Sequence, residues 1–394
     1  MRTLLLGLAL LALSRTTLAE VWEDPDLPAA LASASLVIVG KAPPEGSRGE
    51  PRVRFQVERR IHGEGGLREV EVSGLHDPTA TSGPSFEPGE RVLFVLTRGP
   101  DGTLRTPTPT FGRFPLRGEQ VLYAALRDTF LRLELPLVDY ERFLLLALGR
   151  PAEEAWLEAL LGHLRSSGPG ETGPARARSY LALEALCLVG RGQGAGQELT
   201  ATIARYLDPA GPFQLRISAL RALAACGDNP LPALLSALER DPEPAVRTAA
   251  ARLLARAGAA SPPAGLVERL GGLLPTAPTQ PVRFVGPTDP RTNSWPSPRV
   301  ALLQAIAALG PAPARGALLS ALDEPTQPGD ALLATAEALG RLRDDRSLAR
   351  ELAGRLRGDG EPRDLALCRA LAALTGLPHG EDAAAWKEWA RAGR

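Results

Sequence analysis

The sequence predicts an α+β protein in two parts, a small β-barrel followed by an α-solenoid. Between residues 35 and 135, apolar and polar residues alternate, which is the period of a half-buried strand. From residue 138 onward, apolar residues recur every three or four positions, which is the period of a helix. The chain has 394 residues, a hydrophobic share of 44% and a charged share of 23%, and therefore has room for two or more ordinary folded domains.

Residues 1–19 have the composition of a secretory signal peptide. Arg2 gives a positive start, residues 4–13 form an apolar run, and Ala19 ends a short stretch of small residues. The apolar run is too short to span a bilayer, which takes about 20 residues. We therefore expect cleavage after Ala19 and a periplasmic or secreted protein without stable membrane insertion. An uncleaved anchor is the alternative.

Residues 20–135 are predicted to form the β domain. Residues 53–57 and 70–72 alternate strictly, whereas residues 91–96 (RVLFVL) are almost continuously apolar, as in a strand buried on both faces. Pro-Gly and Asp-Gly turn signals flank this run. About five short strands without a second sheet indicate a small closed or half-closed barrel.

Four segments of this domain carry a family resemblance: 36–40 (LVIVG), 53–59 (VRFQVER), 86–96 (FEPGERVLFVL) and 112–115 (GRFP). They resemble exported bacterial relatives of the netrin-like module. The resemblance implies an OB-type barrel, the fold also seen in tissue inhibitors of metalloproteinases. Those inhibitors chelate the zinc of their target through an amino-terminal cysteine, and this chain has no cysteine before Cys187. A protease-inhibitor-like role of the barrel therefore remains only an alternative.

Residues 136–378 are predicted to form helical repeats. Asp139 is expected to cap the first helix, which residues 149–151 (GRP) end. Six later helices are each expected to end at a glycine, at intervals of 37, 31, 52, 30 and 36 residues: Gly190, Gly227, Gly258, Gly310, Gly340 and Gly376. Helix pairs repeating at such intervals are typical of α-solenoids, because one pair alone cannot bury its apolar face.

The clearest repeat is residues 231–258 (LPALLSALERDPEPAVRTAAARLLARAG). Its first helix is expected to end near Asp241, with Pro242 and Pro244 in the turn. This unit resembles the HEAT repeat, particularly the short bacterial kind named after phycobilisome lyases. The resemblance implies a scaffold of stacked helix pairs and implies no lyase activity.

An arginine opens most of the second helices, and two interpretations are open. These arginines are Arg178, Arg216, Arg247, Arg299 and Arg363. They could form a ladder on a concave face that binds an acidic partner. Alternatively, each could bond the acid or the carbonyl groups of the preceding turn, as Asp241 could do for Arg247, and this structural interpretation is favoured. The candidate binding residues on the helices are Arg216, Arg221, Arg247 and Arg252.

Residues 275–298 interrupt the repeats with seven prolines, Phe284 and Trp295. Insertions in solenoids often lie on the binding face, so Phe284 and Trp295 complete the candidate binding residues. A disordered connector is the alternative.

Residues 379–394 are predicted to form a capping helix that begins after Asp382. Trp386 and Trp389 share one face of this helix and are expected to cover the last repeat. An exposed aromatic anchor for a partner is the alternative.

Catalytic and phosphate-binding motifs are absent from the sequence. The four histidines, His62, His76, His163 and His379, are scattered, and no cysteine pair has metal-ligand spacing, so no metal or cofactor is expected. The three cysteines lie in helical patterns and are expected to be buried hydrophobes rather than to form a Cys187–Cys226 disulfide.

The charge balance argues against a nucleic-acid partner. The 45 basic and 45 acidic residues are spread along the chain without a basic block. We therefore expect a non-catalytic, exported scaffold whose solenoid groove binds a protein or peptide. An enzyme, a hydrolase or lyase with a nonstandard site, is the alternative.

Overall fold

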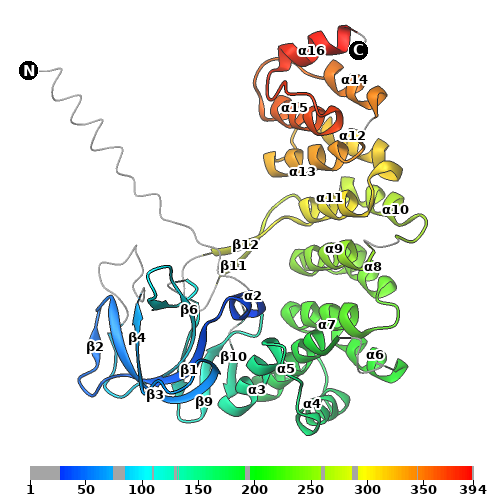
Figure 1. Cartoon of the computed structure of the whole chain (residues 1–394). Coiled ribbons are helices and arrows are strands. Elements are labelled where there is room, and N and C mark those ends of the chain that lie inside the picture. Colours follow the sequence, from blue (N-terminus) through cyan, green and yellow to red (C-terminus); the bar gives the residue numbers. More distant parts are fainter. Residues whose placement is uncertain are drawn as a thin grey trace, which may run out of the picture. The chain divides into compact units, whose positions relative to one another are not determined.

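The computed structural model describes residues 27–73, 85–108, 111–127, 131, 133–190, 196–258, 262–285, 292–343 and 345–392. The predicted signal peptide and its cleavage site lie outside these residues. The chain divides into two compact units, Met1–Arg150 and Pro151–Arg394. The first is mainly β and the second mainly helical (Figure 1), which confirms the α+β class.

The elements of the first unit are, in chain order, α2 (Leu27–Ala32), β1 (Leu36–Lys41), β2 (Ser47–Arg48), β3 (Arg52–Gly63), β4 (Glu69–Ser73), β5 (Ser85–Phe86), β6 (Arg91–Arg98), β7 (Leu104–Arg105), β8 (Arg113–Arg117), β9 (Gln120–Ala124), β10 (Leu133–Pro136) and α3 (Leu137–Ala147).

Five strands close into a barrel in the order β1-β3-β4-β7-β6, because β1 pairs with both β3 and β6. The neighbours are antiparallel except β4 and β7, which are parallel. Phe55 and Phe94 meet edge to face in the barrel core, with ring centroids 4.7 Å apart. Both faces of β6 are buried, as its continuous apolar run predicts.

Helix α3 belongs to the first unit. The Tyr140 ring packs edge to face on Phe114 of β8, and its hydroxyl donates a hydrogen bond to the Ala125 carbonyl at 2.8 Å. The predicted cap at Asp139 is wrong: the helix begins at Leu137, directly after Pro136 ends β10, and Asp139 lies in its first turn. A carboxylate there still faces the positive end of the helix dipole.

His62 lies in β3, where its backbone pairs with Val37 of β1. Strand β3 is longer than its alternating segment because it pairs with β1 beyond that segment. His76 lies outside the described residues.

The elements of the second unit are α4 (Glu154–Ser166), α5 (Gly173–Val189), α6 (Gln197–Ala204), η2 (Arg205–Leu207), α7 (Phe213–Cys226), α8 (Leu231–Arg240), α9 (Pro244–Gly258), α10 (Leu266–Leu273), η3 (Leu274–Thr276), β11 (Val282–Val285), β12 (Thr292–Trp295), α11 (Pro298–Leu309), η4 (Ala312–Ala314), α12 (Arg315–Leu322), α13 (Gly329–Gly340), α14 (Arg346–Gly354), α15 (Pro362–Thr375) and α16 (Ala383–Arg391).

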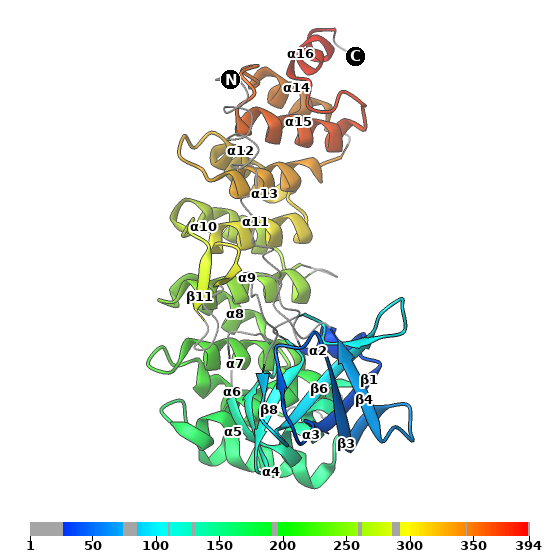
Figure 2. The same cartoon turned by 90° about the vertical axis from the view of Figure 1, so that its left-hand side faces the viewer.

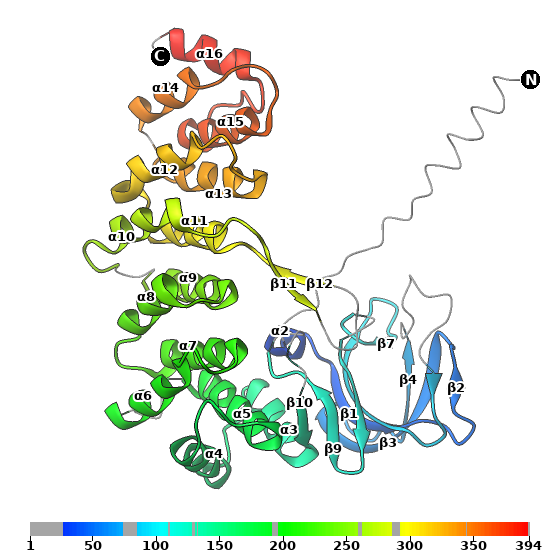
Figure 3. The same ribbon diagram turned by 180° about the vertical axis from the view of Figure 1, so that it is seen from behind.

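Most helices of this unit lie in two layers. The second helix of each pair packs against the second helix of the next, in the series α5, α7, α9, α11, α13 and α15. The first helices, α4, α6, α8, α10, α12 and α14, flank this series on one side (Figures 2 and 3). None of the helices in the described ranges is long and apolar enough to cross a membrane.

All six glycines predicted to end helices lie at a helix end, and four of them show two different reasons. Gly310 and Gly376 follow their helices with φ of 101° and 70°, which side chains other than glycine rarely adopt. Gly258 and Gly340 instead allow close packing with the next pair. A Cβ atom on Gly340 would lie 2.7 Å from the Cβ of Ala373, and one on Gly258 would lie 2.7 Å from Cδ2 of Leu309.

We expect Gly340→Ala to lower the free energy of unfolding by about 1–3 kcal/mol, because the added methyl group would overpack α13 against α15. Gly354→Ala is the matched control, since Gly354 ends α14 with no atom near its Cβ position. The control should leave stability unchanged or raise it by up to about 1 kcal/mol. Urea denaturation measures both variants, and equal effects would contradict this account.

The capping helix is present as predicted. Asp382 caps α16 by accepting hydrogen bonds from the backbone N–H groups of Ala384 and Ala385 at 2.9 and 3.0 Å. Trp386 is fully buried, while Trp389 is half-buried and meets it edge to face. Because α16 packs on α14 and α15, Trp386 cannot be an exposed anchor.

Candidate binding site

Arg216 is a structural residue inside the helix stack. Its guanidinium donates two hydrogen bonds to the carboxylate of Asp241, at 2.8 and 2.9 Å, and both side chains are about 95% buried. The same guanidinium also donates to the carbonyl oxygens of Pro209, at 3.1 Å, and Gly211. Arg216 thus connects the start of α7 to the turn between α8 and α9.

The other helix-opening arginines are also bonded to turns, with one exception. Arg247 Nε donates to the Asp241 carbonyl at 2.6 Å, so Asp241 holds two successive arginines. Arg299 pairs with Glu324, and Arg363 donates to Asp323 at 2.7 Å. The exception, Arg178, has an exposed side chain.

Arg221 neutralises a buried carboxylate. Glu184 on α5 is only 2% exposed and accepts hydrogen bonds from Ser218 Oγ at 2.6 Å and from Arg221 Nη1 at 3.2 Å. The second carboxylate oxygen of Glu184 has no hydrogen-bond partner among the described residues. Arg221 therefore has a structural role at the interface between α5 and α7.

Arg252 and Trp295 come together at the predicted insertion. Its described residues form η3, the antiparallel hairpin β11–β12 and the start of α11 rather than an unstructured connector. The guanidinium carbon of Arg252, on α9, lies 5.6 Å from the ring centroid of Trp295, a cation–π contact. Arg252 is exposed and Trp295 half-buried, so this pair lies at the surface.

The same hairpin carries Phe284. Its backbone pairs with Asn293, two residues before Trp295, while its side chain lies outside the described part of the structure. Thr248 Oγ1 donates to the Pro296 carbonyl at 3.3 Å and ties the base of the hairpin to α9. Of the six predicted binding residues, the structure therefore gathers Arg252, Trp295 and the strand of Phe284.

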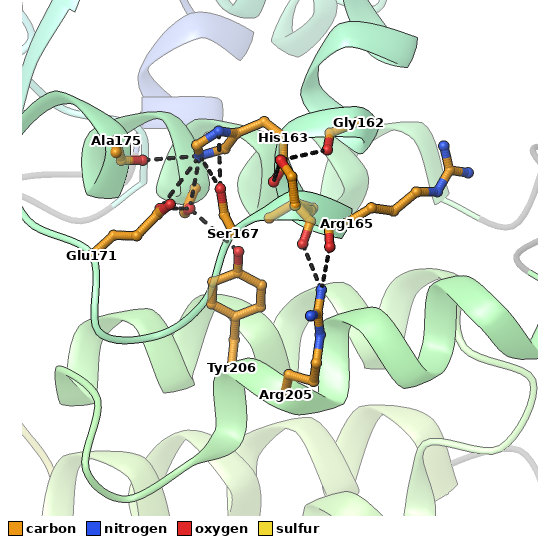
Figure 4. Close-up of polar contacts among 11 residues, drawn as sticks. Gly162, His163, Arg165, Ser167, Glu171, Ala175, Arg205 and Tyr206 are labelled. Atoms are coloured by element: carbon orange, nitrogen blue, oxygen red, sulfur yellow. Dashed lines mark hydrogen bonds and ion pairs between the residues drawn. The ribbon is translucent and has the colours of Figure 1, made fainter.

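A polar cluster around His163, between α4, α5 and η2, was missed in the sequence (Figure 4). His163 Nε2 lies 3.0 Å from both the Ala175 carbonyl and Ser179 Oγ, and 3.5 Å from Glu171 Oε2. Ser179 Oγ donates to Glu171 at 3.1 Å and lies 3.5 Å from the hydroxyl of Tyr206. Burial raises the pKa of Tyr206 above its ordinary value.

The geometry of this cluster differs from a serine–histidine–acid relay, in which the acid and the serine hold opposite nitrogens of the ring. Glu171 and Ser179 are both on the Nε2 side of His163, and Ser179 is fully buried. Ser167 Oγ is 3.1 Å from Nδ1 and 3.4 Å from Nε2, so it is not aimed at one lone pair. These contacts instead hold the loop between α4 and α5 in place.

The cysteines are free thiols inside the helices. Cys226 and Cys368 are buried, and burial raises the pKa of each thiol to about 11, so thiolates are rare at neutral pH. Cys187 is half-buried and donates to the Leu183 carbonyl. Within the described ranges, no three His, Cys, Asp or Glu side chains are grouped as metal ligands would be.

Comparisons with protein-family models, with curated proteins and with solved structures find no match to this chain. No role can therefore be transferred to the Arg252–Trp295 surface from a known protein.

Proposed function

We propose that this protein is an exported, non-catalytic scaffold that binds a protein or peptide through the hairpin-bearing face of a HEAT-type solenoid. The face consists of α9 and the hairpin β11–β12. We propose no nucleic-acid partner, in keeping with the zero net charge and the absence of a basic block. We also propose no cofactor and no stable membrane insertion.

Two structural observations support the finer fold assignments within this proposal. The closed order β1-β3-β4-β7-β6, with β4 parallel to β7, supports a netrin-like barrel of the OB type. The pair α8–α9, joined by a short turn that contains Pro242, supports the HEAT-type repeat.

The observation that carries the proposed function is the contact between Arg252 and Trp295. The hairpin is inserted into an otherwise regular series of helix pairs, and insertions of this kind often lie on the binding face of a solenoid. Trp295 is only half-buried although it is large and apolar. Tryptophan and arginine are the side chains most enriched among residues that dominate binding energy.

We expect Trp295→Ala to weaken partner binding about 30-fold or more, since truncating a central aromatic anchor commonly costs about 2 kcal/mol or more. The mature chain, immobilised, would capture partners from a periplasmic extract, with identification by mass spectrometry and affinity by titration. Tyr123→Ala is the matched control, because Tyr123 is an exposed aromatic residue on the barrel unit. Capture of no partner above background, or equal binding by both variants, would count against the proposal.

A further inference from the structure

The layer formed by the first helices of the pairs opens between α8 and α10. The second helices of these pairs, α9 and α11, pack directly against each other. In contrast, a groove of about 590 Å³ separates α8 from the start of α10. Ligand sites in proteins commonly have volumes of roughly 300–1,000 Å³. The groove therefore has the size of a binding site for a few side chains.

The walls of the groove are apolar. Leu231 and Leu235 project from α8 and are half-buried, and Pro263 and Leu266 lie opposite them at the start of α10. Covering half-buried leucines with another apolar group is favourable by roughly 25 cal/mol per Å² of apolar surface removed from water. An apolar side chain of a partner would therefore bind favourably in this groove.

Charged residues that line the groove make its polar part net positive. Glu239 accepts hydrogen bonds from Arg269 Nε and Nη2 at 2.6 and 2.9 Å, which bridges α8 and α10. Arg240 is exposed and, among the described residues, makes no ion pair with a carboxylate. Two arginines and one glutamate thus leave one positive charge available to a partner.

We propose that this groove binds a short peptide segment in which an apolar side chain stands next to an acidic residue. The apolar side chain would lie between Leu235 and Leu266, and the carboxylate would pair with Arg240. Charge complementarity selects this occupant: the free cation favours an acid, while the apolar walls favour a peptide over a free anion. This surface goes beyond the proposed function, because α8 and α10 form it and the hairpin does not.

The test is selection of a phage-displayed random heptapeptide library on the mature chain, followed by fluorescence titration of the selected peptides. We expect selected sequences to share an aliphatic or aromatic residue next to Asp or Glu. Ser236→Trp would fill the groove from an exposed position, and Arg240→Glu would reverse its free charge. Each should raise Kd about tenfold or more, which corresponds to about 1.4 kcal/mol.

Matched controls make the same changes elsewhere. Ser320→Trp on α12 and Arg346→Glu on α14 alter exposed residues outside both the groove and the hairpin-bearing face, and should change Kd less than about twofold, the usual scale for surface changes. Circular dichroism melting verifies that all four variants fold. A peptide with Lys in place of its acidic residue should bind Arg240→Glu better than it binds the unmodified chain.

Three outcomes would contradict the proposal that the groove binds such a peptide. They are selection of no peptide, selection of peptides without an acidic residue, and binding that Ser236→Trp leaves unchanged. If Trp295→Ala abolished binding and Ser236→Trp did not, the peptide would bind at the hairpin-bearing face and not in the groove. Binding sensitive to Ser236→Trp and indifferent to Trp295→Ala would support the groove as a separate surface.

Discussion

We expect Asp241→Ala to lower the free energy of unfolding of the helical unit by about 3–5 kcal/mol, the usual cost of breaking a buried ion pair by removing one partner. The variant leaves the Arg216 guanidinium about 95% buried without its carboxylate. It also removes the side-chain acceptor that the backbone N–H of Glu243 uses in the turn before α9, at 2.9 Å. Urea denaturation followed by circular dichroism measures the loss.

Two controls separate the buried pair from an ordinary charge effect. Glu381→Ala removes the partner of Arg369 in an ion pair whose side chains are both more than half exposed, and should cost at most about 1 kcal/mol. The double variant Arg216→Met/Asp241→Leu replaces both charges by apolar groups and should recover much of the loss, since no charge is left unpaired. A cost for Asp241→Ala no larger than that of the control would contradict the structural role of Arg216.

Trp386→Ala should be the second strongly destabilising variant. Truncating a packed large aromatic side chain costs about 3–5 kcal/mol. Trp386 is fully buried, its indole N–H donates to the Gly380 carbonyl at 3.0 Å, and its ring meets His379 edge to face at 4.7 Å. Losing it would uncover the apolar end of α15, which invites aggregation. Thermal melting and light scattering measure the two effects.

Trp389→Ala is the matched control, because Trp389 lies on the same helix but is only half-buried. It should lower the melting temperature less than Trp386→Ala and leave the protein monodisperse. If the two variants were equally stable, α16 would not act as the cap of the last helix pair.

The sequence by itself determined the local structure of this protein. Periodicity distinguished the β part from the helical part, since the spacing of apolar residues follows the backbone repeat. Gly310, Gly376 and the cap at Asp382 act through the backbone of the helix that each one ends or begins, so they could be predicted from the sequence. The Asp139 prediction failed because Pro136, at the end of β10, starts the helix earlier than the apolar pattern does.

Only the tertiary structure decided which side chains meet. Asp241 was expected to accept a hydrogen bond from Arg247, and it does so. It also accepts hydrogen bonds from Arg216, 25 residues earlier in the chain. This second contact arises because the stacking of helix pairs brings α7 next to the turn before α9. The same stacking assembles the His163 cluster from three separate elements and sets the gap between α8 and α10. Such pairings depend on how helices pack across the stack, and no periodicity within one helix encodes that packing.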